Sequence, residues 1–340
     1  MRTLGLAIVL GMAITLVAQD SATPSPTPAA PQEQKREVPH PPDRPKPANT
    51  QQQDQDNEPA ATFKVNVKLV NVFTTVTDQN GAPIGGLEKG DFKIYEDGVQ
   101  QHIAVFARES ALPLSIILGI DASLSTRKDL PLEIESARRF SHAILRPIDA
   151  VSVMQFSEIV KEVVPFTADA QRIDRGIGNV RTGAATALYD AIFLGSEALE
   201  KRQGRKVMVL ITDGGDTMSQ SSYQDAVRAA QISETILYAI IMVPIEASAG
   251  RDLGGEHALI QITKDTGGKY YYATSISQLD QAFRQISEEL RTQYLLAYYP
   301  PKKAFSDFRQ IKVDVDSSKI SSGTEVRVFH RTGYYTSKIQ

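Results

Sequence analysis

Apolar residues in the middle of this chain form runs that alternate with helical patterns. Four runs are almost wholly apolar, as in strands buried on both faces of a parallel sheet, and they cover residues 114–120, 151–156, 207–211 and 236–243. Between and after them, apolar positions recur at helical spacing, for example at Leu188, Ile192 and Leu199. Residues 112–300 are therefore predicted to form an α/β domain, a doubly wound, mostly parallel sheet with helices on both faces.

The flanks of this region follow the two-residue period of half-buried strands. Phe63, Val65 and Val67 alternate with polar residues, as do the apolar residues of 311–315. Asp97-Gly98 predicts a hairpin turn between a strand at 92–95 and a segment that ends at 103–106. We expect residues 61–111 and 301–340 to pair into one small β-sandwich, with the α/β domain inserted between its halves.

Two helix boundaries have recognisable end signals. Ser277, with Asp280 three residues later, resembles a capping box at the start of the last helix of the α/β domain. Gly267 and Gly268 fit the end of the helix before it.

The first sixty residues have a different composition. Residues 1–20 hold an apolar run behind Arg2, which is typical of a secretory signal peptide. Residues 21–60 contain ten of the 18 prolines and are expected to be a disordered, extended linker. The protein is therefore predicted to be exported, to the periplasm, the cell envelope or the extracellular space. An uncleaved signal anchor is the only membrane attachment that this pattern allows.

Composition and charge narrow the possible functions. Lys and Arg number 37 against 40 Asp and Glu, for a net charge of −3, so nothing indicates a nucleic-acid partner. The chain has no cysteine, which excludes disulfides, thiolate zinc sites and cysteine nucleophiles.

Polar residues gather where predicted strands end. Asp121, Ser123 and Ser125 follow the first central strand, Asp213 follows the strand at 207–211, and Thr186 opens a helix between them. Open parallel sheets bind ligands beyond the carboxyl ends of their strands, so these loops are expected to converge. Asp190 and Asp216 lie nearby and are interpreted as solvated charges outside the site.

Carboxylates and hydroxyls without imidazole or thiol suit a hard cation. Mg²⁺, Mn²⁺ or Ca²⁺ suits these oxygens, with Ser123, Ser125 and Thr186 as neutral ligands and Asp121 and Asp213 balancing the charge directly or through water. Few of these ligands are charged, so the ion should stay electrophilic enough to accept a carboxylate from another molecule.

The constellation of Asp121, Ser123, Ser125, Thr186 and Asp213 resembles the metal-ion-dependent adhesion site of von Willebrand factor type A domains. The resemblance covers roughly residues 112–300, and the segments at 91–98, 293–300 and 333–335 are similar to the flanks of bacterial exported members. It implies a Mg²⁺- or Mn²⁺-dependent, non-enzymatic module that binds a protein through its Asp or Glu side chain. The chain departs from the family pattern at Ala122 and Leu124, and at the pair 184–185, where a glycine pair is common; these departures concern loop flexibility rather than the ligands.

Two other functions remain open at this point. A hydrolase could use an oxygen-ligated Mg²⁺ to activate water, although the chain has no phosphate-binding glycine loop and no nucleophile elbow. A structural envelope protein could carry the same residues at a metal site that has no function.

Overall fold

The computed structural model describes residues 69–108, 112–126, 129–243, 253–301, 307–316, 320 and 325–336. The predicted signal peptide and linker, the start of the first predicted strand at 63–68 and a predicted turn at 321–323 lie outside the described residues. Among the residues described, no helix has the length and apolar character needed to cross a membrane.

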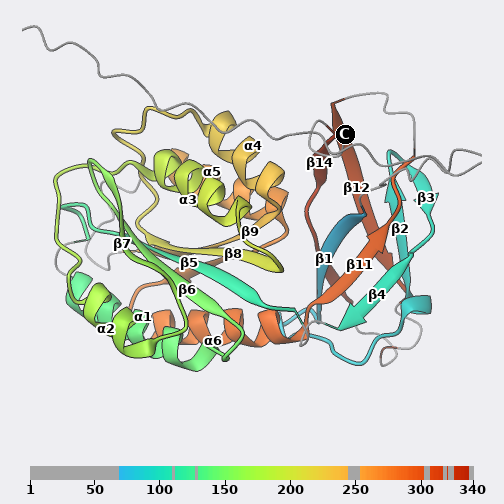
Figure 1. The fold of residues 1–340 in the computed structure, drawn as a ribbon, viewed down its shortest axis with the longest axis horizontal. Helices are drawn as coiled ribbons and strands as arrows, with labels where there is room; N and C mark the ends of the chain where they lie inside the picture. Colours follow the sequence, from blue (N-terminus) through green and yellow to red (C-terminus); the bar gives the residue numbers. More distant parts are fainter. Residues whose placement is uncertain are drawn as a thin grey trace, which may run out of the picture. The chain divides into compact units, whose positions relative to one another are not determined.

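A six-stranded sheet forms the centre of the α/β region (Figure 1). Its strands lie in the order β10-β9-β8-β5-β6-β7, and all neighbours are parallel except β6 and β7. The strands are β5 (Leu114–Asp121), β6 (Ala150–Phe156), β7 (Val160–Thr167), β8 (Arg205–Thr212), β9 (Thr235–Met242) and β10 (Tyr270–Ala273). Every residue of β5, β8 and β9 is buried, which explains why these strands could be recognised as continuous apolar runs.

Helices cover both faces of this sheet, as predicted (Figure 1). One face packs against α1 (Leu130–Ile144), α2 (Ala170–Ile177) and α6 (Ile276–Thr292). The other packs against α3 (Leu188–Glu200), α4 (Tyr223–Ser233) and α5 (Leu253–Thr266). The doubly wound α/β fold is therefore confirmed.

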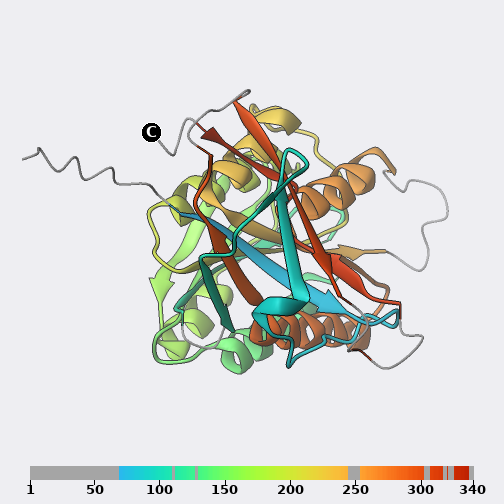
Figure 2. The same ribbon diagram turned by 90° about the vertical axis from the view of Figure 1, so that its right-hand side faces the viewer.

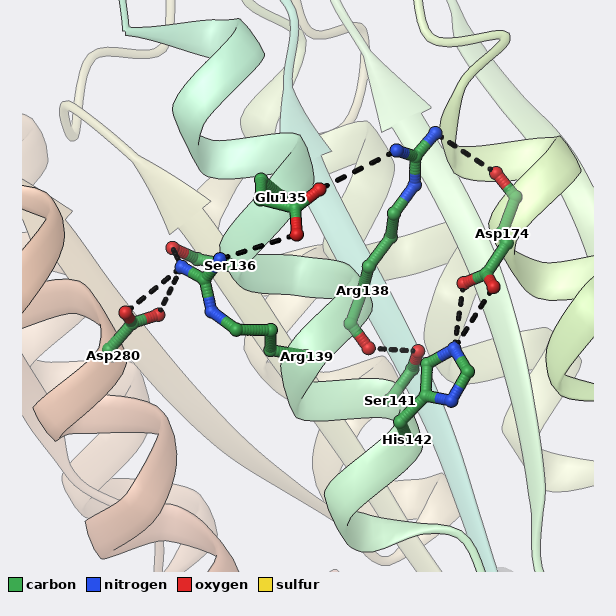
Figure 3. A network of polar contacts seen from close by, with 8 residues as sticks. All are labelled: Glu135, Ser136, Arg138, Arg139, Ser141, His142, Asp174 and Asp280. Carbon is green, nitrogen blue, oxygen red and sulfur yellow. Dashed lines mark hydrogen bonds and ion pairs between the residues drawn. The ribbon is translucent and has the colours of Figure 1, made fainter.

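Polar contacts on the surface tie α1 to the two helices beside it (Figure 3). Arg139 donates two hydrogen bonds of 2.9 Å to the carboxylate of Asp280 on α6. His142 lies 2.9 Å from the carboxylate of Asp174 on α2. Beneath them, the rings of Phe140 and Phe283 stack with centroids 4.5 Å apart. These contacts fix the position of α1, the helix that follows the Asp121 loop.

Two antiparallel sheets come from the segments on either side of the α/β region (Figure 2). Their strand orders are β13-β1-β11-β4 and β14-β12-β2-β3. The strands are β1 (Val70–Thr77), β2 (Phe92–Glu96), β3 (Val99–Gln101), β4 (Val105–Arg108), β11 (Tyr294–Tyr298), β12 (Phe308–Val315), β13 (Arg327–Phe329) and β14 (Gly333–Tyr335). A 3-10 turn, Lys89–Asp91, precedes β2. Apolar residues of both sheets form one core, which strands from both flanks share with β11, a strand in the stretch predicted for the α/β domain.

Two local predictions need correction. The strand that pairs with β2 across Asp97-Gly98 is β3, which ends at Gln101, whereas Val105 and Phe106 belong to β4 and pair with β11 in the other sheet. The cap of α6 is Ser275 rather than Ser277, because the Ser275 side chain accepts the hydrogen bond from the backbone N–H of Gln278. The chain turns into the helix two residues earlier than the Ser277 pattern suggested.

Gly267 ends α5 as predicted, and the fold requires glycine there for two reasons. Its φ is +85°, in the left-handed region. A Cβ at this position would also lie 2.5 Å from the backbone nitrogen of Arg331, in the segment between β13 and β14. The helix end and the antiparallel region therefore approach each other backbone to backbone.

A buried polar cluster lies within the antiparallel region. The carboxylate of Glu96 accepts hydrogen bonds from the hydroxyls of Tyr298 (2.6 Å) and Tyr334 (2.8 Å) and from the guanidinium of Arg309. Burial and the nearby Glu96 raise the pKa of both tyrosines, so the hydroxyls stay protonated and donate. The cluster joins β2, β11, β12 and β14 across the two sheets.

We expect Glu96→Gln to lower the free energy of unfolding by about 1.5–3 kcal/mol, because it removes the charged acceptor of buried hydrogen bonds while Arg309 keeps its ion pair with Asp97 over 2.7 Å. Tyr334→Phe removes one hydrogen bond from the same carboxylate and should cost only about 1–1.5 kcal/mol. Urea denaturation of the two variants and the wild type measures both values. Equal losses of unfolding free energy in the two variants would show that the charge of Glu96 does not contribute to stability.

Candidate functional site

The candidate site lies where the strand order of the central sheet reverses. From β5 the chain passes through α1 to β6 on one side of β5, and it later returns as β8 on the other side. Such a reversal leaves a crevice beyond the carboxyl ends of the two strands. Asp121 is the last residue of β5, and Asp213 directly follows β8.

Hydrogen bonds hold the Asp121 loop in a tight turn. Oδ1 of Asp121 accepts a bond of 2.9 Å from the backbone N–H of Ser123, and the two serine hydroxyls of Ser123 and Ser125 lie 2.9 Å apart. Thr126 donates its hydroxyl to the carbonyl oxygens of Asp121 and Ser123. Asp121 and Ser123 are buried, while Ser125 is exposed. The loop therefore carries its side-chain oxygens from the interior to the surface.

The loop that carries Thr186 is bonded directly to the Asp121 loop. The backbone N–H of Gly183 donates to the carbonyl oxygen of Ala122 over 2.6 Å. A Cβ at Gly183 would lie 2.4 Å from the hydroxyl of Ser157, so only glycine permits this approach. The N–H of Ala184 donates to the carboxylate of Glu158 over 2.7 Å. This bond holds the loop in place where the sequence departs from the glycine pair.

The third loop is bonded to the other two. The N–H of Thr217 donates to the carbonyl oxygen of Thr186 over 2.9 Å, and the N–H of Thr186 donates back to the Thr217 hydroxyl over 3.0 Å. At the strand level, the hydroxyl of Thr212 donates to Oδ2 of Asp121 over 2.7 Å. The three loops that hold the five candidate ligands thus form one hydrogen-bonded unit.

Asp190 and Asp216 are not the solvated charges that the sequence suggested. Oδ1 of Asp216 accepts from the backbone N–H groups of Leu188 and Tyr189 at the start of α3, over 2.8 and 3.2 Å. The carboxylate of Asp190 accepts from two N–H groups of the loop after β8, those of Gln220 and Ser221. Asp216 thus caps the start of α3 and Asp190 binds the loop to the same helix, and both contacts join segments that are distant in sequence.

Negative charge gathers at this edge of the sheet. Burial raises the pKa of Asp121 to about 6, against hydrogen bonds from Thr212 and Ser123 that lower it, and Asp213 adds repulsion. Burial also raises the pKa of Glu133 to about 8, and Asp121, Asp129 and Asp213 contribute. Glu133 lies in the first turn of α1 and is fully buried. Sequence reasoning missed it, because one acidic residue among apolar helix positions ordinarily marks a solvated face.

The donor set fits a hard divalent cation. Within the part of the chain that the structure describes, the Thr186 hydroxyl and the Asp213 carboxylate have no hydrogen-bond partner, and the hydroxyls of Ser123 and Ser125 are bonded to each other. Each oxygen of Asp121 accepts one protein hydrogen bond and keeps a lone pair. No group of three or more His, Cys, Asp or Glu side chains among the described residues could hold a metal ion. Any ion here would therefore depend on the hydroxyls as well as the carboxylates.

Comparison with known proteins agrees with the fold. The family model for the von Willebrand factor type A domain matches residues 116–215, which span β5 to the loop after β8. This stretch of the chain is therefore similar to von Willebrand factor type A domains. No curated protein matches the chain.

The solved structures that match this chain do so at low sequence identity. A von Willebrand factor type A protein from Catenulispora acidiphila is 11% identical, with a TM-score of 0.47 over 81% of this chain and 77% of that one. The PilB minor pilin from Streptococcus sanguinis is 14% identical, with a TM-score of 0.43 over 53% of this chain and 62% of the pilin. The von Willebrand factor domain of a type V pili tip protein from Porphyromonas gingivalis is 12% identical, with a TM-score of 0.43 over 52% and 94%. The matched part spans less than two thirds of the pilin.

Thr212→Val tests the bond that joins β5 and β8 at the site. Valine keeps the shape but removes the donor to Asp121 and the acceptor for the N–H of Gly214, so the metal-free protein should lose about 1–3 kcal/mol of stability. Urea denaturation in the presence of a chelator measures the loss. Thr212→Ser keeps the hydroxyl and serves as the control; unfolding of both variants at the same urea concentration would contradict this role.

Proposed function

We propose that the protein is an exported, non-enzymatic binding module of adhesion type. Its binding reaction is the completion of a bound divalent ion's coordination by an Asp or Glu side chain of a partner protein. The observation that carries the proposal is the hydrogen-bonded unit of three loops, which gathers two carboxylates and three hydroxyls at the switch point of the sheet.

The residues would divide the task by charge and burial. Ser123, Ser125 and Thr186 would offer neutral oxygens, while Asp121 and Asp213 would balance the charge directly or through water. Mg²⁺ and Mn²⁺ favour such ligands, and Mg²⁺ commonly retains several waters in its octahedral shell. Since only two of the five ligands are charged, the ion would keep affinity for a further anionic oxygen.

Exposed apolar side chains surround this edge and would contribute to partner choice. Leu124, Ile159 and Met218 are each more than half exposed. Leu124 lies within the Asp121 loop, Ile159 lies in the turn after β6, and the N–H of Met218 bonds to the carbonyl oxygen of Thr186 over 3.1 Å. A partner segment that places apolar residues beside its carboxylate would bury this surface while its carboxylate meets the ion. An ionic contact shielded in this way from water is also stronger.

Export is proposed from the first sixty residues alone. The apolar run of residues 1–20 would direct secretion. The proline-rich segment 21–60 would then act as an extended spacer between the folded region and the point where the N-terminus is cleaved or anchored.

Mg²⁺ or Mn²⁺ should raise the melting temperature of the metal-free protein, because a ligand that binds only the folded state stabilises it by mass action. Asp121→Ala should abolish the increase. Asp314→Asn removes a partly exposed carboxylate from β12, which pairs with Lys312, and should respond like the wild type. Differential scanning calorimetry at increasing concentrations of either ion measures the shift in melting temperature. An Asp121→Ala shift as large as that of the wild type would refute the site.

Peptides selected on the Mn²⁺-loaded protein should carry an Asp or Glu beside apolar residues. Replacement of that acid by Asn or Gln, or addition of a chelator, should abolish binding by fluorescence anisotropy. Leu124→Ser should weaken peptide binding without changing the affinity for Mn²⁺. Selection of peptides without an acidic residue would contradict the proposed mechanism.

The hydrolase alternative makes the opposite prediction. Phosphatase, protease and esterase substrates with added metal should show no turnover that depends on Asp213. Turnover that is lost in Asp213→Ala would replace the binding function with a metal-dependent hydrolase.

A further inference from the structure

Glu133 is buried in a setting that does not satisfy its carboxylate. It lies in the first turn of α1, where its backbone N–H donates to the carbonyl oxygen of Asp129 over 2.9 Å, and its exposed fraction is 0%. The buried face of the helix next to it consists of Leu130, Ser136 and Ala137. Glutamate is almost never fully buried in proteins unless it is paired.

Neither carboxylate oxygen of Glu133 has a hydrogen-bond partner in the described part of the chain. Nor does Glu133 form an ion pair with any described residue. A buried polar group that is not hydrogen-bonded costs free energy, and an isolated carboxylate costs more. Such a group in a folded protein needs a reason to be retained.

The charges around Glu133 make the arrangement less favourable still. The first turn of α1 is bonded to the Asp121 loop: the carbonyl oxygen of Thr126 accepts the backbone N–H of Leu130 over 3.0 Å, and the Thr126 hydroxyl donates to the carbonyl oxygens of Asp121 and Ser123. Asp121, Asp129 and Asp213 also raise the pKa of Glu133. Asp121 and Asp213 are the two carboxylates of the candidate metal site, and they also repel each other. A cation at the site would convert this repulsion into attraction for all of them.

We propose that Glu133 is a further member of the cation site, which helps to retain the ion from outside direct coordination. This inference rests on the proposed function. The outer position follows from the absence, among the described residues, of a group of three or more acidic or histidine side chains able to hold a metal. Its two unpaired oxygens are available to the water molecules that Mg²⁺ keeps when it binds to proteins.

The outer position also fits the exposure of the other ligands. Ser125 is exposed and Asp213 is half-buried, so the outward side of the site is open to a partner. Glu133 is on the buried side, so its carboxyl group does not occupy that opening. It can therefore strengthen retention of the cation and leave the partner's position free.

The decisive variant is Glu133→Met, measured in the full chain for both Mn²⁺ affinity and melting temperature in a chelator. The affinity should fall about 10- to 100-fold, as for other residues that act behind the metal ligands. The metal-free melting temperature should rise, because the variant removes an unpaired buried carboxyl group. A residue with only a structural role would give a lower melting temperature and an unchanged affinity.

Two further variants separate charge from packing. Glu135→Met changes a partly exposed glutamate on the same helix, which contacts Arg138 and Arg139 (Figure 3), and should leave the Mn²⁺ affinity unchanged. Glu133→Asp keeps the charge and should recover part of the affinity that Glu133→Met loses.

The outcomes distinguish this inference from the proposed function. Wild-type protein that does not bind Mn²⁺ would overturn both. Wild-type protein that binds Mn²⁺ as tightly as Glu133→Met does would overturn the role of Glu133 alone, whatever the change in melting temperature.

Discussion

The repulsion among carboxylates at one edge of the central sheet is the constraint on which the account of this protein depends. Asp121 and Glu133 are both fully buried, and each interacts unfavourably with Asp213. The fold tolerates this because hydrogen bonds from Ser123 and Thr212 hold Asp121 in place, while rigid strands and a packed helix fix the rest. An arrangement of this kind is costly without a cation and favourable with one.

The positions of the loops follow from the topology rather than from the loops themselves. Since β5 and β8 are adjacent and parallel, their carboxyl ends meet, and short backbone bonds such as that from Gly183 to Ala122 complete the convergence. Helix α1 is fixed by contacts farther along its length: the bond from Arg139 to Asp280 and the stacked rings of Phe140 and Phe283. The scaffold is therefore stiff where the candidate ligands need to be oriented.

The fold could be predicted from the sequence because the apolar pattern is strong and local. Buried parallel strands such as β5 and β8 appear as uninterrupted apolar runs, and the helix stripes have the expected spacing. Strand pairing depends on contacts that are remote in sequence, which is why Val105 and Phe106 were placed in the hairpin with β2. The cap of α6 was misplaced because Ser275 and Ser277 both precede plausible partners, and only the backbone path distinguishes them.

The candidate site could be predicted only in part. The five ligand candidates follow a motif and lie at strand ends, and their loops are bonded together as the topology suggested. The residues that support the ligands have weaker signals in the sequence. The pattern around Thr212 indicates only the last residue of a strand, and that around Glu133 indicates an ordinary charge on a helix surface. The roles of Asp190 and Asp216 have no local signal, because the N–H groups that they accept from lie in segments about thirty residues away.

The most direct test of the central claim is the location of a bound ion. Crystals of the protein grown with Mn²⁺ would be measured for anomalous scattering near the manganese absorption edge. One strong peak is expected within ligand distance of the oxygens of Ser123, Ser125 and Thr186, with Asp121 and Asp213 beside it. A peak elsewhere, or none at saturating Mn²⁺, would contradict it.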